Sequence, residues 1–403
     1  MKYAIIIPDG CADEPVPSLG HLTPLQKAHI PNMDAIAQAG IVGRSNNTPA
    51  SLPAGSDVAT MCVFGYDPLK FYTGRAPLEA AATGISLGER DWAIRCNLVT
   101  IENGVMKSFH AGHISTEEAA ELLTTLQEKL GGDAVAFFPG VSYRNILVWR
   151  GSDDSPAPLL AGSTKTHAPH DFSDRSILGA YPSGAGCEEM TRLMTDAHRI
   201  LADHPVNRRR IAEGNLPATD IWLWGEGKRP ALQNFQERFG VRGAIISAVN
   251  LLFGLGELIG WETIRVPGAT GFVNTNYDGK AQAAADALYR ADLVCVHVEA
   301  PDEAGHDGDA ETKVRALELI DERIVGPVHE ALKKWGDYRI LVTPDHPTPV
   351  RLRTHSHADV PWALCGKDVS ADNAARYDET VAETAPVVFE KGNQLMEMFI
   401  QES

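Results

Sequence analysis

The sequence predicts an α/β protein whose mainly parallel sheet is flanked by helices and interrupted by a smaller inserted α+β domain. A short apolar run, Tyr3–Ile7, opens the chain and ends at a Pro-Asp-Gly turn, as a buried first strand does. From about residue 240 to residue 343, helix-like and strand-like segments alternate. Because parallel neighbours need a crossover between them, this alternation predicts a mainly parallel sheet.

The N-terminal elements follow from local patterns. Apolar residues recur at helical spacing over residues 22–40, and Pro31 marks a helix start. A loop rich in Pro, Ser and Gly spans residues 49–56, and the apolar stretch that begins at Asp57 indicates a helix. Ser56 is therefore expected at a helix N-terminus, where backbone N–H groups favour an anion.

The middle of the chain has a different character. It contains short strand-like runs, two helices and a long loop rich in Pro, Gly and His. The strands are expected at 97–101, 135–138, 145–149 and from Asp220, the helices at 115–130 and 187–204, and the loop at 156–183. We therefore expect residues 1–85 and 236–403 to form the core domain and residues 86–235 an inserted cap or substrate domain.

The C-terminal half carries most of the alternation. Helices are expected over residues 244–259, 281–291 and 313–332, and strands over 262–266, 293–298 and 338–343. With the first strand, these segments predict the parallel part of the sheet.

Composition narrows the function classes. The 403 residues carry a formal net charge of −17, which argues against a nucleic acid or an anionic membrane as partner but allows a small phosphorylated substrate. The six cysteines are scattered without a C-x-x-C pair, as in a reduced cytoplasmic protein. No apolar stretch approaches the roughly 20 residues that a membrane span needs.

Acidic and histidine residues follow strand-like segments at several places. They are Asp9, the pair Asp302 and His306, the pair Asp345 and His346, and the run with His355 and His357. In an α/β sheet such positions converge at the carboxyl edge. Carboxylates mixed with imidazoles suit zinc or manganese, and two such ions can stabilise both oxygens of an in-line phosphoryl displacement. Singly, each residue is better explained as a helix cap or a hydrogen-bonded structural histidine, and it is the recurrence at several strand ends that indicates metal ligands.

Ser56 lies in a Gly-Ser-Asp turn before the expected helix. It is either an N-cap serine, with Asp57 in the favourable first turn, or a nucleophile whose hydroxyl a divalent metal activates. The two interpretations are compatible.

Ten segments in order along the chain resemble the archaeal-type cofactor-independent phosphoglycerate mutases, a family of the alkaline phosphatase superfamily. The segments are Pro8–Pro15, Pro53–Ala59, Phe71–Ala80, Arg95–Thr100, Gly112–Thr116, Pro139–Arg144, Ile221–Gly225, Val266–Gly271, His297–His306 and Val342–Pro349. The resemblance covers nearly the whole chain and implies an alkaline-phosphatase-like fold with two divalent metal ions (Mn, Zn, Co or Mg).

The resemblance also implies roles for individual residues. Asp9, Ser56, Asp345 and His346 would hold one metal, and Asp302, His306 and a third histidine the other. The family pattern His-Ser-x-Asp-Pro-Val-Pro is replaced here by His-Ser-His-Ala-Asp-Val-Pro, ending at Pro361. Counting back from Pro361 favours His355 as the third ligand, with His357 as the alternative.

Substrate contacts are implied by the same segments. The candidate cations for phosphate and carboxylate oxygens are Arg75, Arg144, Lys228, Arg229 and Lys280. His113 is a candidate proton shuttle between glycerate hydroxyls. Each is otherwise a surface charge or, for His113, a residue at a helix entry.

These residues predict a metal-dependent phosphotransferase that interconverts 2- and 3-phosphoglycerate through a phosphorylated Ser56. A small-molecule kinase resembling homoserine kinases and a metal-dependent phosphatase are the alternatives. The chain has no G-x-x-x-x-G-K-[ST] loop, which disfavours nucleotide use. The oligomeric state is left open.

Overall fold

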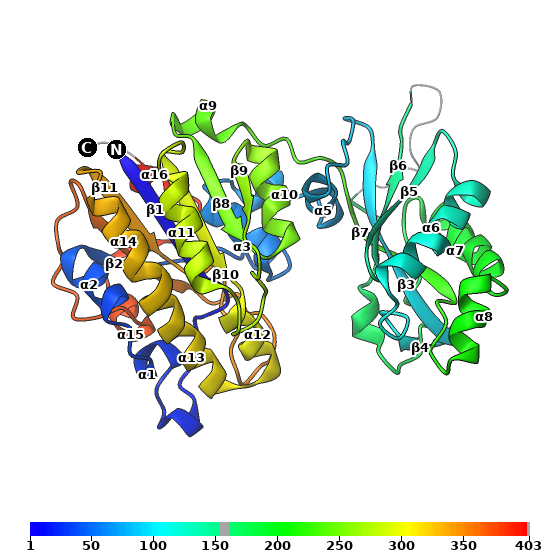
Figure 1. The fold of residues 1–403 in the computed structure, drawn as a ribbon, viewed down its shortest axis with the longest axis horizontal. Coiled ribbons are helices and arrows are strands. Elements are labelled where there is room, and N and C mark those ends of the chain that lie inside the picture. Colours follow the sequence, from blue (N-terminus) through cyan, green and yellow to red (C-terminus); the bar gives the residue numbers. More distant parts are fainter. Residues whose placement is uncertain (153–161, 401–403) are drawn as a thin grey trace. The chain divides into compact units, whose positions relative to one another are not determined.

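The computed structural model describes residues 1–152 and 162–400, and it divides into two compact units (Figure 1). The larger unit comprises Met1–Tyr72 and Ala231–Ser403, and the smaller unit is the continuous segment Thr73–Pro230. Part of the expected loop at 156–183 lies outside the described residues. Within the described ranges, no helix combines the length and apolar character needed to cross a membrane. The cytoplasmic location stays a prediction.

The larger unit is built on an eight-stranded sheet. Its order is β13 (Val387–Phe389), β2 (Ile41–Ser45), β12 (Val360–Gly366), β11 (Tyr338–Val342), β1 (Lys2–Pro8), β10 (Leu293–Val298), β8 (Gly243–Ser247) and β9 (Glu262–Arg265). The strands from β11 to β9 are all parallel, and β12 pairs antiparallel with both of its neighbours. The sheet is therefore mainly parallel, as predicted.

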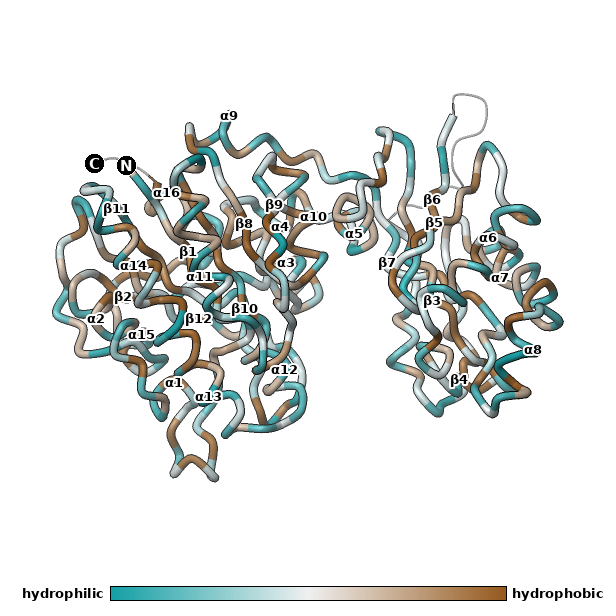
Figure 2. Tube along the Cα trace, viewed as in Figure 1, coloured by the Kyte–Doolittle hydropathy of each residue, from teal (hydrophilic) through white to brown (hydrophobic). Residues whose placement is uncertain are grey.

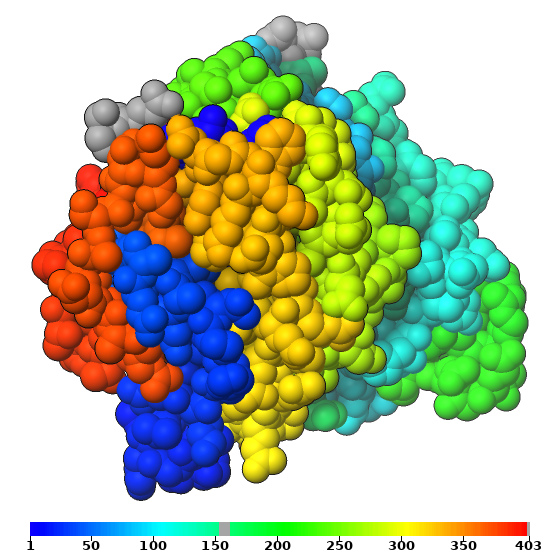
Figure 3. All heavy atoms as spheres, turned by 60° about the vertical axis from the view of Figure 1, so that its left-hand side comes forward, coloured from blue at the N-terminus to red at the C-terminus, as the bar shows by residue number. Residues whose placement is uncertain are grey.

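Helices cover this sheet and close its core. They are α1 (Pro24–Lys27), α2 (Pro31–Ala39), α3 (Ser56–Val63), α4 (Pro68–Phe71), α9 (Phe235–Phe239), α10 (Asn250–Ile259), α11 (Tyr277–Ala287), α12 (Ala300–Asp307), α13 (Ala310–Ile320), α14 (Gly326–Lys333), α15 (Glu379–Glu383) and α16 (Gln394–Ile400). On one face, α2, α13, α14 and α11 lie side by side (Figures 1 and 3). The central strands are apolar along their length because helices shield both faces (Figure 2).

Three predicted helices of the larger unit differ from the structure, and for the one expected over residues 281–291 the difference is a shift to Tyr277–Ala287. The helix expected over residues 244–259 is wrong, because Gly243–Ser247 forms strand β8 and α10 begins only at Asn250. All five residues of β8 are buried, and such an apolar run has no periodicity that separates strand from helix. The helix expected over residues 313–332 divides into α13, a π-helical turn at Asp321–Val325 and α14.

The smaller unit contains an antiparallel sheet with helices. Strand β3 (Trp92–Glu102) pairs with β4 (Val105–Ser108), β6 (Arg144–Trp149) and β7 (Asp220–Gly227), and β5 (Val135–Val141) pairs with β6. Helices α6 (Thr116–Leu130) and α7 (Cys187–Leu201) contribute Leu and Met side chains to its core, and α5 (Ala76–Ala82) and α8 (Pro205–Ala212) complete the unit. It is an α+β unit, as predicted.

The edges of the smaller unit differ from the expected boundaries at residues 86 and 235. Helix α5, which was expected in the core domain, packs with the smaller sheet: Ala76 and Ala80 are buried against Ala93, Ile146 and Val148. At the other end, residues 231–235 belong to the larger unit. The role of the smaller unit as a cap remains a prediction.

Candidate active site

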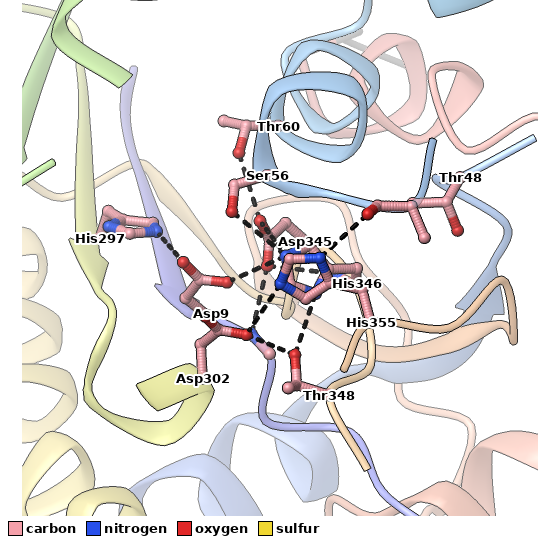
Figure 4. Close-up of polar contacts among 12 residues, drawn as sticks. Asp9, Thr48, Ser56, Thr60, His297, Asp302, Asp345, His346, Thr348 and His355 are labelled. Carbon is pink, nitrogen blue, oxygen red and sulfur yellow. Dashed lines mark hydrogen bonds and ion pairs between the residues drawn. The ribbon is translucent and has the colours of Figure 1, made fainter. Parts of the chain in front are cut away.

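Three carboxylates meet where neighbouring parallel strands of the larger unit end (Figure 4). Asp9 directly follows β1, Asp302 lies in the first turn of α12 after β10, and Asp345 follows β11. All three side chains are buried. The strand–helix alternation therefore brings Asp9 together with Asp302 and Asp345, which lie 293 and 336 positions further along the chain.

Gly10 permits this convergence. It adopts a left-handed backbone with φ of +62°, and a Cβ at this position would lie 2.5 Å from Asp302 Oδ1 and 2.6 Å from Thr348 Oγ1. Any other residue would collide with the carboxylate cluster as well as strain the turn. The glycine of the Pro-Asp-Gly turn after the first strand is thus required by the close packing of the site.

His346 lies at the centre of the cluster. Its Nε2 atom is 3.4 Å from Asp9 Oδ1, 3.6 Å from Asp345 Oδ2 and 3.2 Å from Ser56 Oγ. Asp345 is fixed through its other oxygen, which accepts from the backbone N–H groups of Gly10 and His346. The ring nitrogen of His346 and three oxygen atoms therefore face one small volume.

Ser56 is the first residue of α3, and Gly55 occupies the N-cap position. The Ser56 hydroxyl is hydrogen-bonded to His346 rather than to the backbone of its own helix. This arrangement excludes the N-cap interpretation. The position of Ser56 at the start of the helix leaves its hydroxyl directed toward the carboxylate and histidine cluster (Figure 4).

A second group surrounds Asp302. His306 Nε2 is 3.4 Å from Asp302 Oδ2, and His355 Nε2 is 3.5 Å from Asp302 Oδ1. The Nδ1 atoms of the two rings contact the backbone carbonyls of Arg353 and Ala54. Because a carbonyl only accepts, each Nδ1 carries a hydrogen, and neutral rings present both Nε2 atoms as bare acceptors.

Those two Nε2 atoms are 3.0 Å apart. Two bare acceptors cannot share that distance unless a proton or a metal ion lies between them. The hydrogen bond to Asp302 raises the pKa of His306 to about 9. The same donor set of two imidazoles and a carboxylate is the one that zinc and related ions take.

Among the described residues, two triplets of side chains have ligand atoms within 4.8 Å of one another: Asp9, Asp345 and His346, and Asp302, His346 and His355. His355 therefore joins the cluster. His357 is exposed, and its Nδ1 contacts the carbonyl of Thr48 instead. Geometry thus separates the two histidines that the sequence left as alternatives.

The electrostatics of the cluster fit a cation. Among the described residues, no Lys or Arg forms an ion pair with Asp9, Asp302 or Asp345. Asp9 Oδ1 is buried without a hydrogen-bond partner in that same part of the chain. Burial and the nearby charges of Asp345 and Asp302 raise the pKa of Asp9 well above its usual range. A bound divalent cation would remove this penalty.

Sequence reasoning missed the residues that support the three carboxylates. His297 Nε2 is 2.9 Å from Asp9 Oδ2, Thr60 Oγ1 donates to Asp345 Oδ2 at 3.4 Å, and Thr348 Oγ1 donates to Asp302 Oδ1. Burial lowers the pKa of His297 to about 3. A histidine inside an apolar strand, as in the run Leu293–Val298, is the one signal that could have indicated such a role.

Lys280 has a different environment from the one expected of a substrate cation. Its side chain is fully buried, and its ammonium group donates to the carbonyl of His297 at 3.0 Å. Burial lowers the pKa of Lys280 to about 8. The structure thus places Lys280 behind the carboxylate cluster, as a support for β10.

The smaller unit contains an arginine cluster around Glu79. Arg75 Nε and Arg95 Nε lie 3.0 and 2.8 Å from the two oxygens of Glu79. Burial opposes ionisation of Glu79, but the charges of Arg95, Arg75 and Arg144 outweigh it and lower the pKa of this carboxyl. Two guanidinium groups thus share one carboxylate, and the charge of Arg144 acts on it without a direct contact. Arg95, which the sequence analysis did not single out, is buried with its guanidinium 4.0 Å above the ring of Trp224.

His113 lies in a strained loop of the same unit. Ala111, Gly112 and His113 all have positive φ angles, and only Gly112 adopts such angles without strain. Arg210 stabilises the loop by donating to the carbonyls of Ala111 and Gly112. The ring of His113 is exposed and stacks on His110 at 3.8 Å. Strain of this kind marks loops with a functional constraint.

The two remaining candidate cations follow β7. Lys228 is half-buried with its ammonium 5.4 Å from the ring of Trp92, and Arg229 is exposed. Neither belongs to the arginine cluster around Glu79.

The site residues lie within regions similar to known proteins. A family model described as 2,3-bisphosphoglycerate-independent phosphoglycerate mutase matches residues 37–207. A probable enzyme of that name from Geobacter sulfurreducens is 48% identical over 405 residues, covering 99% of this chain and 100% of the relative. A second relative of that name, from Methanothrix thermoacetophila, is 46% identical over 99% of this chain and 100% of its own length. The chain belongs to this mutase family.

Solved structures agree with the family assignment. A protein of Pyrococcus horikoshii matches with a TM-score of 0.82 and 29% identity, covering 100% of this chain and 98% of that one. A cofactor-independent phosphoglycerate mutase from Thermoplasma acidophilum matches with a TM-score of 0.67 and 27% identity, covering 100% and 99%. The mutase fold therefore extends over both units of this chain.

Proposed function

We propose that this enzyme interconverts 2- and 3-phosphoglycerate by transferring the phosphoryl group to Ser56 and back. The observation that carries the proposal is the position of the Ser56 hydroxyl, 3.2 Å from His346 Nε2 at the start of α3. The hydroxyl serves no helix cap and faces a cluster of buried acids and histidines. The names of the relatives, all phosphoglycerate mutases, support the choice of substrate.

The cluster is suited to hold two divalent ions, with Mn, Zn, Co or Mg as candidates. Asp9, Ser56, Asp345 and His346 would hold one ion, and Asp302, His306 and His355 the other. The buried and unpartnered oxygen of Asp9 and the facing nitrogens of His306 and His355 support this assignment. When bound, such ions supply positive charge to phosphoryl oxygens and lower the pKa of a coordinated hydroxyl.

The chain's own groups then divide the chemistry. In the forward half-reaction, a bond forms between Ser56 Oγ and phosphorus while the bond from phosphorus to the glycerate O3 breaks, and the Ser56 proton is passed to O3. In the return half-reaction, a bond forms between O2 of the same glycerate and phosphorus while the bond from phosphorus to Ser56 Oγ breaks, and the proton of O2 passes to Ser56. The backbone N–H groups at the start of α3 favour the phosphate on Ser56. Water must not reach the phosphorylated Ser56, because hydrolysis would release inorganic phosphate. The transfer therefore requires a site closed to solvent.

The smaller unit would bind the glycerate and exclude water. Its cluster of Arg75, Arg95 and Arg144 near Glu79 presents guanidinium groups of the kind that bind a carboxylate or phosphate. We assign to His113, whose exposed ring is presented by a strained loop, the relay of these protons: delivery of one to O3 in the forward half-reaction and removal of one from O2 in the return half-reaction. Lys228 and Arg229 remain candidates for weaker contacts at the end of β7.

One set of assays separates this function from its alternatives. Purified protein is given 3-phosphoglycerate, then homoserine with ATP, then a phosphate monoester, each before and after exhaustive chelation and after metal is restored. We expect reversible formation of 2-phosphoglycerate that is lost on chelation and regained with Mn²⁺, Zn²⁺ or Co²⁺. Dominant release of inorganic phosphate would identify a phosphatase, and ATP-dependent phosphorylation of homoserine a kinase. Full mutase activity in protein that elemental analysis shows to be metal-free would overturn the metal assignment.

A further inference from the structure

A chain of polar side chains crosses three adjacent strands behind Asp9. His297 lies on β10 and is fully buried, with Nε2 2.9 Å from Asp9 Oδ2 and Nδ1 3.1 Å from Ser247 Oγ. Ser247 ends β8, and the register that pairs Val296 with Ile246 brings Ser247 beside His297. The sheet order β1, β10, β8 therefore lines up Asp9, His297 and Ser247.

Donors and acceptors along this chain are satisfied in a single direction. Ser247 Oγ accepts from the backbone N–H of Val249 at 3.0 Å, which leaves its own hydrogen for the imidazole. Because the Asp9 carboxylate only accepts, Nε2 of the neutral His297 ring carries the N–H, and Nδ1 is left to accept the serine hydrogen. The serine hydroxyl thus stabilises the tautomer that a carboxylate partner requires.

The hydrogen bond from His297 holds one carboxylate oxygen of Asp9 and leaves the other oxygen, called here the open oxygen, without a hydrogen bond to the described residues. Oδ2 accepts from His297, whereas Oδ1 is buried, has no hydrogen-bond partner in the described part of the chain and lies 3.4 Å from His346 Nε2. The rotation of the carboxylate is set by the held oxygen. The open oxygen consequently faces the volume shared by Asp345 and His346 (Figure 4).

Lys280 fixes the backbone of the same histidine. Its fully buried ammonium donates to the carbonyl of His297 at 3.0 Å. His297 is thus held through its ring by Ser247 and through its backbone by Lys280. A histidine constrained at two points can orient a partner more strictly than a mobile one.

We propose that His297, held in its tautomer by Ser247, is a positioning residue that orients Asp9 and presents Asp9 Oδ1 to the metal ion of that site. The inference rests on the proposed function, because it assigns a metal to Asp9. Histidines and carboxylates behind metal ligands commonly raise metal affinity in this way. Neither residue touches substrate in this role.

Paired substitutions separate orientation from packing. His297→Leu removes the donor, whereas His297→Gln keeps an amide N–H at a comparable reach. Ser247→Ala removes the hydroxyl that stabilises the tautomer, and Ser247→Thr keeps it. His329→Leu is the matched control, since His329 Nε2 contacts the hydroxyl of Tyr338 at 2.9 Å, at the start of β11 and away from the cluster.

The readout is the affinity for Zn²⁺ or Mn²⁺ alone, measured by titration calorimetry on folded, metal-stripped protein. We expect His297→Leu to weaken one of the two sites about 10- to 100-fold, and Ser247→Ala to weaken the same site. His297→Gln and Ser247→Thr should recover most of the affinity, and His329→Leu should bind like wild type.

Each outcome decides a different statement. If wild type binds two ions and His297→Leu binds both as tightly, His297 is only a packed core residue and the inference fails while the proposed function stands. If wild type binds no divalent ion, the metal assignment of the proposed function fails and takes the inference with it. If His297→Leu does not fold, equal affinity in Ser247→Ala and Ser247→Thr overturns the inference.

Discussion

The two units concentrate charge of opposite sign. In the larger unit, Asp9, Asp302 and Asp345 are buried together, and the ion pairs that the structure describes for them all involve histidine. In the smaller unit, guanidinium groups gather around the single carboxylate of Glu79. Charges of one sign gathered out of water are costly unless charge of the opposite sign compensates them.

The difference bears on what we propose that each unit binds. The acidic cluster of the larger unit suits cations, and the arginine cluster of the smaller unit suits an anion. A phosphorylated carboxylic acid handled with divalent metal ions supplies both. In the proposed function, the larger unit would carry the phosphoryl chemistry at Ser56, and the smaller unit would recognise the glycerate.

Replacing Ser56 should give the largest loss of turnover. It tests whether the larger unit carries out the phosphoryl transfer. Ser56→Ala keeps α3 and its backbone donors but removes the nucleophile, so turnover should fall by about 10³-fold or more. Initial rates with 3-phosphoglycerate measure the loss. Ser115→Ala is the matched control, because Ser115 is a true N-cap that accepts from Glu118 N at 3.1 Å. That variant should cost about 1 kcal/mol of stability and leave turnover near wild type.

A crossed pair of substitutions would sharpen the assignment of cation and anion to the two units. Asp302→Asn should weaken metal binding about 10- to 100-fold. With excess metal present, the same variant should bind a nonreacting phosphocarboxylate with a smaller loss of affinity. Arg144→Met should do the reverse, raising KM for phosphoglycerate about 10- to 100-fold while metal affinity is retained. Calorimetry with metal and steady-state kinetics measure the two effects. Equal loss of both properties in both variants would refute the division.

The smallest expected effect concerns the acid stability of the arginine cluster. The lowered pKa of Glu79 means that its ion pairs contribute stability above the ordinary value of 4.5 and lose it as pH falls through the lower folded value. Glu79→Gln should therefore cost on the order of 1–3 kcal/mol at pH 7, and this difference from wild type should shrink below about pH 4.5. Denaturant unfolding at several pH values measures it. A constant difference down to pH 3 would show that the charge of Glu79 contributes nothing.

Much of the larger unit and its carboxylate cluster can be predicted from the sequence, because the acidic residues of the cluster follow recognisable apolar strands. Asp9, Asp302 and Asp345 each come just after an apolar strand, and parallel strands share an edge. Strand β8 was mistaken for part of a helix because buried apolar runs lack periodicity. The strands β2, β12 and β13 were not predicted, since they are joined through long or irregular segments without the helix–strand alternation.

The residues that support the site were harder to predict. His297 and Ser247 are fifty positions apart and meet only through the register of β8 and β10. Arg95 belongs to the arginine cluster through its contacts with Glu79 and Trp224, and no sequence spacing predicts these contacts. Lys280 was expected at the substrate and is instead buried, because its position in α11 packs its side chain against β10.

The most direct measurement is a rapid-quench experiment with phosphoglycerate labelled in its phosphoryl group, followed by peptide mass spectrometry. If Ser56 accepts the phosphoryl group, acid-quenched enzyme should carry the label on the peptide that contains Ser56 within one turnover. The label should then return to glycerate when quenching is delayed. A label found on a histidine, or active enzyme with no covalent phosphate at any quench time, would contradict transfer through Ser56.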